Sequence, residues 1–401
     1  MRGPRVTNQG TQLHATSRRA RPDSARSLLV APLEIQVNPI DEREGAPSHA
    51  GWRKWGLLQG VRMMHALGVS RVLRRIPGFM RLKRGENGFL EFPYLKVCRT
   101  RNVQILTYHR VNDEHDQFFP AMPVSVFQSQ MEHLSECYRV LPLEEMAKRI
   151  QDNDIPDNAV VVTFDDGYRD NYTQAFPILR RLRLPATIFL ATGVIGTDGV
   201  LWHDRVFSAF RLTKKTALIG FFERSSHLEL SSLADKLKAQ TQVLKILREL
   251  CESDRDFQIG RLRECLDIGS DAKQERIMLD WEEVSHMSRG GISFGSHTVT
   301  HPILSRLSHE EVERQIALSS EAIEKHVRIR PRTFAYPNGT RADFTETTKH
   351  VLKEAGYLCA VTTSFGTNAY GQDLFELKRG QPWEHDVNTF SAKMIWYKFA
   401  S

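Results

Sequence analysis

The stretch AVVVTFDDGYRDNY, residues 159–172, holds the feature on which the predicted fold depends. It opens with six apolar or β-branched residues, a short run typical of a buried strand. Two adjacent carboxylates, Asp165 and Asp166, follow at once and precede Gly167. They are either the solvated end of a strand or a pair with something positive between them. The rest of the chain has to separate these two interpretations.

A short β-rich run followed by a helical segment recurs from about residue 100 onward. Five more runs predict strands over 102–108, 186–192, 291–296, 332–337 and 358–363. Predicted helices lie between most of them, over 124–135, 143–151, 170–182, 309–326 and 345–355. This alternation favours a parallel sheet, open or closed into a barrel, with ligands at the carboxyl ends of its strands. Residues 200–285 interrupt the pattern with a predicted helical insertion that includes 233–251.

Composition is that of an ordinary soluble protein, with 401 residues, 41% hydrophobic and 26% charged. The net charge of +7 comes from one stretch, because residues 51–85 hold nine Lys or Arg and no Asp or Glu. The remainder is not basic, so the sequence pI of about 9.1 is poor evidence for nucleic-acid binding. We expect no nucleic-acid partner.

The N-terminal hundred residues differ from the rest. Residues 1–50 are rich in Arg, Ser, Pro and Gln with little periodicity, which predicts a disordered leader. Residues 51–100 are predicted to form a basic helical arm, because apolar residues recur there at near-helical spacing with arginines between them. Two interpretations of 51–85 stay open: a helix packed on the main domain, or a helix on an anionic membrane surface.

Cysteine usage and hydropathy bear on the compartment. The five cysteines are widely spaced without a CxxC pair, which argues against a disulfide framework and against a cysteine zinc site. No apolar run approaches the length of a membrane span, and MRGPRVTNQG lacks the apolar stretch of a secretory signal. We expect a cytoplasmic protein, with peripheral contact to the inner membrane through 51–85 as the open alternative.

A second candidate group is SHTVTHP, residues 296–302, directly after a predicted strand. His297 and His301 are four residues apart, the spacing that puts two imidazoles on one helix face in HExxH zinc sites. The preceding glycine, the β-branched residues and Pro302 argue against a helix here, but a tight turn can also bring two imidazoles together. Two histidines and one carboxylate would bind a cation and leave positions for water and substrate. The second carboxylate would stay free to act as a base.

TFDDGYRDN, SHTVTHP and FAYPNG, in this order and spacing, resemble the polysaccharide deacetylases of the NodB-homology type, carbohydrate esterase family 4. ILTYHRVND and ATIFLATGVIG add to the resemblance, which covers roughly residues 101–395. It implies a distorted (β/α) barrel of seven or eight strands over 101–398. It also implies a divalent metal, usually zinc with cobalt or nickel as alternatives, and hydrolysis of the linear amides of N-acetylated amino sugars.

Matched by motif, Asp165 corresponds to the general base of the family. Asp166, His297 and His301 correspond to its three metal ligands. The resemblance thus makes the two aspartates unequal, one a base and the other a ligand.

The chain departs from the family's pattern in two catalytic places. It lacks a clean RxPY motif, whose Arg orients the base, and we take Arg379 as the candidate partner of Asp165. It also lacks the LxH motif that supplies the general acid. His109, at the end of the first predicted strand, is our candidate, with His385 as the second option. A purely structural role is the competing interpretation of both histidines.

Two aromatic residues are candidates for substrate binding. Tyr336 lies in FAYPNG at a predicted strand end, and Trp202 opens the insertion in the sequence Trp-His-Asp. Aromatic faces stack on sugar rings, but for Trp202 the competing interpretation, that it anchors the insertion to the barrel, is the favoured one.

YHRV and FAYPNG resemble a subgroup associated with exopolysaccharide and cell-surface glycan synthesis, so an acetylated glycan or lipid-linked saccharide is the expected substrate. The alternative is a non-catalytic glycan-binding member that retains the fold and the metal site. A glycosyltransferase could also use the paired aspartates, but that interpretation leaves the histidines unexplained.

Overall fold

A computed structural model describes residues 101–222, 226–269 and 276–397. The predicted leader, 1–50, and the predicted basic arm, 51–100, lie outside the described residues. The membrane contact predicted for 51–85 therefore stays a prediction. Within the described ranges, no helix is long and apolar enough to cross a membrane.

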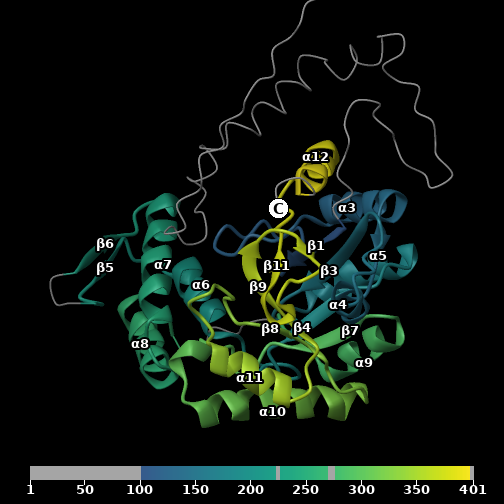
Figure 1. Ribbon diagram of the computed structural model, residues 1–401. Helices are drawn as coiled ribbons and strands as arrows, with labels where there is room; N and C mark the ends of the chain where they lie inside the picture. The colour runs from purple at the N-terminus through teal and green to yellow at the C-terminus, as the bar shows by residue number, and fades with distance from the viewer. Residues whose placement is uncertain (1–100, 223–225, 270–275, 398–401) are drawn as a thin grey trace, which may run out of the picture. The chain divides into compact units, whose positions relative to one another are not determined.

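The predicted alternation of strands and helices is confirmed, and the strands form one barrel-like sheet (Figure 1). Parallel strands follow the order β1-β3-β4-β7-β8-β9-β11. Their bounds are β1 (Asn102–Tyr108), β3 (Ala159–Phe164), β4 (Thr187–Leu190), β7 (Ser293–Ser296), β8 (Thr333–Ala335), β9 (Cys359–Phe365) and β11 (Leu377–Arg379). Two short strands are added, β2 (Arg139–Val140) beside β3 and β10 (Asn368–Ala369) antiparallel to β1.

The sheet nearly closes, because the chain after β11 returns to β1. The backbone N–H of Gly380 donates to the carbonyl of Ile105 (2.8 Å), and that of Thr107 donates to the carbonyl of Gly380 (3.0 Å). This closure puts β11 and β3 on either side of β1. The strand number agrees with the predicted barrel of seven or eight strands.

Helices connect the strands and cover the outside of the barrel (Figure 1). Their bounds are α3 (Val124–Cys137), α4 (Leu143–Gln151), α5 (Phe176–Leu182), α9 (Trp281–Arg289), α10 (His309–Val327), α11 (Glu346–Glu354) and α12 (Val387–Tyr397). A short π-helix, Asn171–Ala175, precedes α5, and two 3₁₀ turns span Leu304–Arg306 and Leu374–Glu376. In α4 the apolar residues at helical spacing are the buried ones, which is why the pattern predicted this helix.

Alternate strand residues face two different cores. Val161 belongs to a cluster with apolar residues of β1, β4, β8, β9 and β11, which fill the barrel interior, and with the buried residues of α4, which packs against them. Its neighbour Val162 belongs to a second cluster, together with residues of α3, α5 and α9. Towards the carboxyl ends of the strands the interior row becomes polar, since Asp165 continues it after β3 and His297 after β7. The sheet therefore places both motifs at one end of the barrel.

The insertion lies between β4 and β7, to one side of the barrel in Figure 1. It consists of α6 (Trp202–Leu212), α7 (Leu233–Arg248), α8 (Glu252–Cys265) and the hairpin β5 (Ala217–Ile219) with β6 (His227–Glu229). These elements share a hydrophobic cluster of their own. The predicted helix 233–251 is too long, because α7 ends at Arg248. The prediction missed α8, whose buried apolar residues number only two, Ile259 and Leu262.

Candidate metal centre and catalytic site

The two carboxylates of the opening stretch lie at the end of β3, buried side by side. Asp165 and Asp166 are each 2% exposed. The backbone N–H of Asp165 donates to the carbonyl of Tyr108 (3.0 Å), so the ladder with β1 reaches the first carboxylate. Asp166 and Gly167 then take positive φ angles, 75° and 87°. This turn, which is strained for an aspartate, directs the two side chains to different neighbours.

The two histidines of SHTVTHP are brought together by a tight turn after β7 and not by a helix. Thr298 and His301 have positive φ angles of 68° and 56°. The side-chain oxygen of Gln315, on α10, accepts the backbone N–H groups of Val299 (2.9 Å) and Thr300 (3.2 Å). The turn is therefore held from outside the barrel while both imidazoles point inward.

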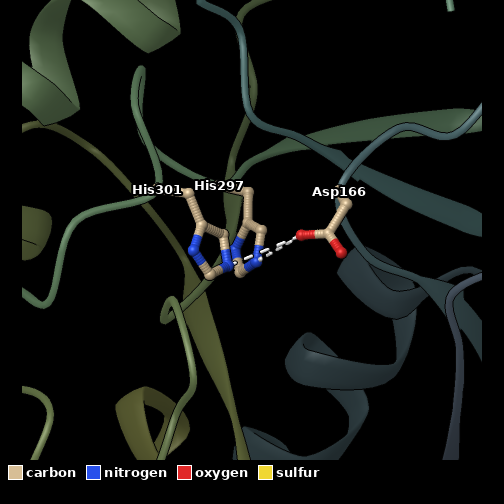
Figure 2. Close-up of side chains that lie close together, drawn as sticks. All are labelled: Asp166, His297 and His301. Carbon is tan, nitrogen blue, oxygen red and sulfur yellow. Dashed lines mark ion pairs between the residues drawn. The ribbon is translucent and has the colours of Figure 1, made fainter. Parts of the chain in front are cut away.

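Asp166, His297 and His301 converge on one point, as Figure 2 shows. The Nε2 atoms of His297 and His301 lie 3.4 and 3.5 Å from Oδ1 of Asp166. All three ligand atoms lie within 4.8 Å of one another, and all three residues are buried. Nδ1 of His297 lies 2.7 Å from the carbonyl of Ala335, which fixes this N–H outward and leaves Nε2 free to ligate.

This group fits a divalent cation. Within the described residues Oδ1 of Asp166 has no hydrogen-bond partner, although it is buried. Buried polar atoms rarely lack a hydrogen-bond partner, which indicates that a ligand belongs here. One carboxylate oxygen and two imidazole nitrogens form a donor set that suits zinc and related metals. Three protein ligands leave coordination positions for water or a substrate oxygen.

Electrostatics at the three residues favour an added positive charge. Burial alone would raise the pKa of Asp166, but the contact with His297 and the nearby His301 hold it well below its usual range. Burial and the neighbouring His297 lower the pKa of His301 well below 6.5. Burial also lowers the pKa of His297, but its contact with Asp166 and the charges of both aspartates raise it overall. Without a metal, a proton on His297 provides the positive charge beside Asp166 that a bound cation would otherwise provide.

The structure pairs Asp165 with Arg379 at the end of β11. Two guanidinium nitrogens of Arg379 donate to the two carboxylate oxygens, at 2.8 and 2.7 Å, and Nε donates to the carbonyl of Thr362 (2.8 Å). Burial would raise the pKa of Asp165, but the Arg379 charge and its hydrogen bonds lower it below the usual 3.8. Asp165 is thus an ionised carboxylate held in one orientation. Arg332, two residues before FAYPNG, is exposed and bonds Glu144 instead.

His109 is the histidine that the structure brings to Asp165. Its Nε2 lies 3.9 Å from Oδ2 of Asp165, and its side chain is 31% exposed. The side-chain amide of Asn171 donates to the His109 carbonyl (2.8 Å). Asp170 holds the two residues that follow His109: its carboxylate accepts from the Arg110 side chain (2.8 Å) and from the Val111 N–H (3.1 Å). The second option, His385, lies exposed on the segment after β11.

The two aromatic candidates have their rings buried in packing positions. Tyr336 is 1% exposed, donates its hydroxyl hydrogen to the carbonyl of Phe375 (3.0 Å) and stacks on Phe344. Its side chain belongs to the apolar cluster under α10 and α11, so the structure does not bring it to the site. Trp202 is 5% exposed and donates its indole N–H to the carbonyl of His301 (3.3 Å). It anchors the insertion to the metal-ligand turn.

Sequence reasoning missed His203, which lies on the other side of Asp166. Its Nε2 is 3.9 Å from Oδ2 of Asp166 and 3.1 Å from the hydroxyl of Tyr168. The ring of Phe119 packs near both this histidine and His109, with centroid distances of 6.2 and 6.4 Å. The Trp-His-Asp triplet at the start of the insertion is the one sequence signal that points to this histidine.

Comparisons with known proteins agree with this geometry. A family model described as polysaccharide deacetylase matches residues 152–360. YxkH of Bacillus subtilis is 22% identical over 288 residues, 71% of this chain and 73% of YxkH. A poly-beta-1,6-N-acetyl-D-glucosamine N-deacetylase of Staphylococcus aureus is 25% identical over 180 residues, 44% of this chain and 61% of that relative.

A solved structure supports the fold. The Streptococcus pyogenes deacetylase PplD, in complex with acetate, superposes with a TM-score of 0.50 at 20% sequence identity. The match covers 74% of this chain and 99% of PplD.

Removing one imidazole of the converging group should abolish metal binding. We expect wild type to retain about one divalent ion per chain after dialysis, and His297→Ala to retain none, as measured by elemental analysis. His286→Ala, which removes an exposed histidine bonded to Tyr172 (2.9 Å), is the matched control and should retain the ion. Equal metal content in wild type and His297→Ala would contradict the site.

Arg379→Gln should destabilise the fold strongly, because it leaves the buried charge of Asp165 without its partner. We expect a loss of about 3–5 kcal/mol in the free energy of unfolding, measured by urea denaturation. The control is Arg341→Gln at the exposed pair with Glu346, where about 1 kcal/mol or less is expected. A loss no larger at Arg379 than at Arg341 would show that the buried pair is not needed.

Proposed function

The chain belongs to the polysaccharide deacetylase family, hydrolases that act on carbon–nitrogen bonds, and we propose that it removes N-acetyl groups from an amino-sugar glycan. The observation that carries the proposal is the division between the two aspartates. Asp166 faces two histidines, whereas Asp165 is clamped by Arg379 and points to His109. A base beside a cation site, together with a separate proton donor, is the set of groups that metal-dependent amide hydrolysis requires.

We assign Asp166, His297 and His301 as ligands of a divalent cation, with zinc first and cobalt or nickel as alternatives. When bound, the cation would polarise the acetamide carbonyl and make a water more acidic. Arg379 keeps the Asp165 carboxylate ionised at neutral pH, so it needs no prior deprotonation to act as the base. Because its pKa is low it is a weak base, and the role depends on the cation making the water more acidic.

In the proposed reaction Asp165 accepts a proton from water while the water oxygen bonds to the acetyl carbon. The carbon–nitrogen bond then breaks as His109 donates a proton to the amine nitrogen, which releases the free amine and acetic acid, and the acid ionises to acetate. Asp165 then loses its proton to solvent and His109 regains one, which restores the starting state. Arg379 keeps both oxygens of Asp165 in place and stays protonated throughout. His109 is partly exposed beside the buried Asp165, as a donor that meets a bulky leaving group must be.

The substrate class is inferred from a relative and from the sequence motifs. The name of the staphylococcal relative gives an N-acetylglucosamine polymer as the substrate of that protein. The alignment covers 61% of that protein's length. We propose an acetylated glycan or lipid-linked saccharide of exopolysaccharide or cell-surface glycan synthesis as the substrate here. A non-catalytic glycan-binding protein is the competing function, and the assays below separate the two.

Asp165→Asn should lose catalysis while keeping the metal. We expect acetate release from N-acetylglucosamine oligomers, with zinc, cobalt or nickel added, to fall about 10²- to 10⁴-fold in kcat. Asp256→Asn, which changes an exposed carboxylate paired with Arg205, is the control and should match wild type. Equal acetate release by wild type and Asp165→Asn would rule this residue out as the base. No release by wild type from any acetylated glycan would favour the binding function.

His109→Gln should affect substrates according to their leaving groups. An amine must be protonated to leave, whereas the phenolate of 4-nitrophenyl acetate leaves without a proton. We therefore expect kcat for N-acetylglucosamine oligomers to fall about 10²-fold or more, and kcat for the ester to fall much less. Equal losses on both substrates would argue against His109 as the donor. His385→Gln is the matched comparison, and a selective loss there instead would assign the role to His385.

A further inference from the structure

The helix that opens the insertion begins against the metal-ligand residues. At the first turn of α6 the side chain of Asp204 accepts the backbone N–H of Leu201 (3.2 Å), which fixes the start of the helix. The indole of Trp202 donates to the carbonyl of His301 (3.3 Å). Between these two residues, His203 turns toward Asp166. The insertion thus reaches two of the three residues assigned as ligands.

His203 and the two ligand histidines approach different oxygens of Asp166. His297 and His301 lie 3.4 and 3.5 Å from Oδ1, whereas His203 Nε2 lies 3.9 Å from Oδ2. His203 is therefore not one of the converging group, and it faces the oxygen that this group leaves free. Its side chain is 12% exposed and that of Asp166 is 3% exposed, so little water screens the contact.

Tyr168 determines which way the proton of His203 points. The tyrosine hydroxyl donates its single hydrogen to Oδ1 of Asp204 (2.9 Å), and Nε2 of His203 lies 3.1 Å from the same hydroxyl. Because this hydrogen is donated to Asp204, the hydroxyl oxygen can only accept from His203. The Nε2 atom must then carry hydrogen, which it donates to Tyr168, and Oδ2 of Asp166 lies 3.9 Å from the same nitrogen as an electrostatic contact. While Nε2 donates this hydrogen to Tyr168, its lone pair is not available to a metal.

We propose that His203 is a positioning residue of the metal centre, which orients the Asp166 carboxylate through Oδ2 and so raises the affinity of the site for its cation. The proposal rests on the function proposed above, because it takes Asp166 as a ligand through Oδ1. A group that contacts the side of a ligand residue away from the metal fixes the orientation of that ligand, and its loss weakens metal binding. On this account the insertion completes the site, since α6 supplies a group that the barrel strands do not.

The test measures metal affinity and ligand geometry, independently of activity. The zinc dissociation constant is measured by competition with a chromophoric chelator at pH 8, for wild type, His203→Gln and Tyr168→Phe. We expect His203→Gln to raise it about tenfold to a hundredfold, and Tyr168→Phe to raise it in the same direction. The visible absorption bands of the cobalt-loaded protein should shift in His203→Gln, because the orientation of the carboxylate changes.

The matched control is His286→Gln, which breaks a comparable histidine–tyrosine contact with Tyr172 (2.9 Å) and should leave both the zinc affinity and the cobalt spectrum unchanged. Thermal unfolding confirms that each variant is folded. Wild-type zinc affinity in both His203→Gln and Tyr168→Phe, with an unshifted cobalt spectrum, would overturn the proposal and leave the proposed function intact. A wild type that binds no zinc would overturn the metal site itself, and this proposal with it.

Discussion

Two ionised carboxylates buried next to each other at the end of β3 require positive charge, and the barrel supplies it from two directions. A buried charge without a partner costs several kcal/mol, so Asp165 and Asp166 need partners of their own. In the sheet order β11-β1-β3-β4-β7, Arg379 reaches Asp165 from two strands away on one side. His297 and His301 reach Asp166 from two strands away on the other. Near-closure of the sheet through Gly380 makes both approaches available at once.

The residues after the aspartates connect the site to its surroundings. Tyr168 bonds the first turn of the insertion through Asp204, and Asn171 holds the backbone of His109. The carboxylate of Asp170 accepts hydrogen bonds from three consecutive residues after β1, Arg110 to Asn112. One short stretch therefore supplies the two carboxylates and also the contacts that place the histidines on both sides of them. A change in this stretch would disturb several parts of the site together.

The strands, most helices and the metal-ligand group were predictable, because their signals are local: an apolar run, a period of 3.6, or a charge directly after a strand. Arg379 was predicted as the partner of Asp165 because the RxPY arginine is missing, and the structure shows the pair, but the barrel closure that brings them together is not visible in any local pattern. Tyr336 lies next to a motif, but its ring points outward into the core under α10 and α11. His203 was missed because its direction depends on how α6 packs in the insertion's own cluster. Side-chain direction was the part that the sequence alone did not determine.

The central claim is that the buried carboxylate of Asp166 and two imidazoles form one cation site. X-ray absorption spectroscopy of the zinc-loaded protein tests it most directly. The account predicts only nitrogen and oxygen neighbours at about 2.0–2.2 Å, with the outer scattering of two imidazole rings. A sulfur shell at about 2.3 Å, or an all-oxygen shell without imidazole scattering, would contradict it.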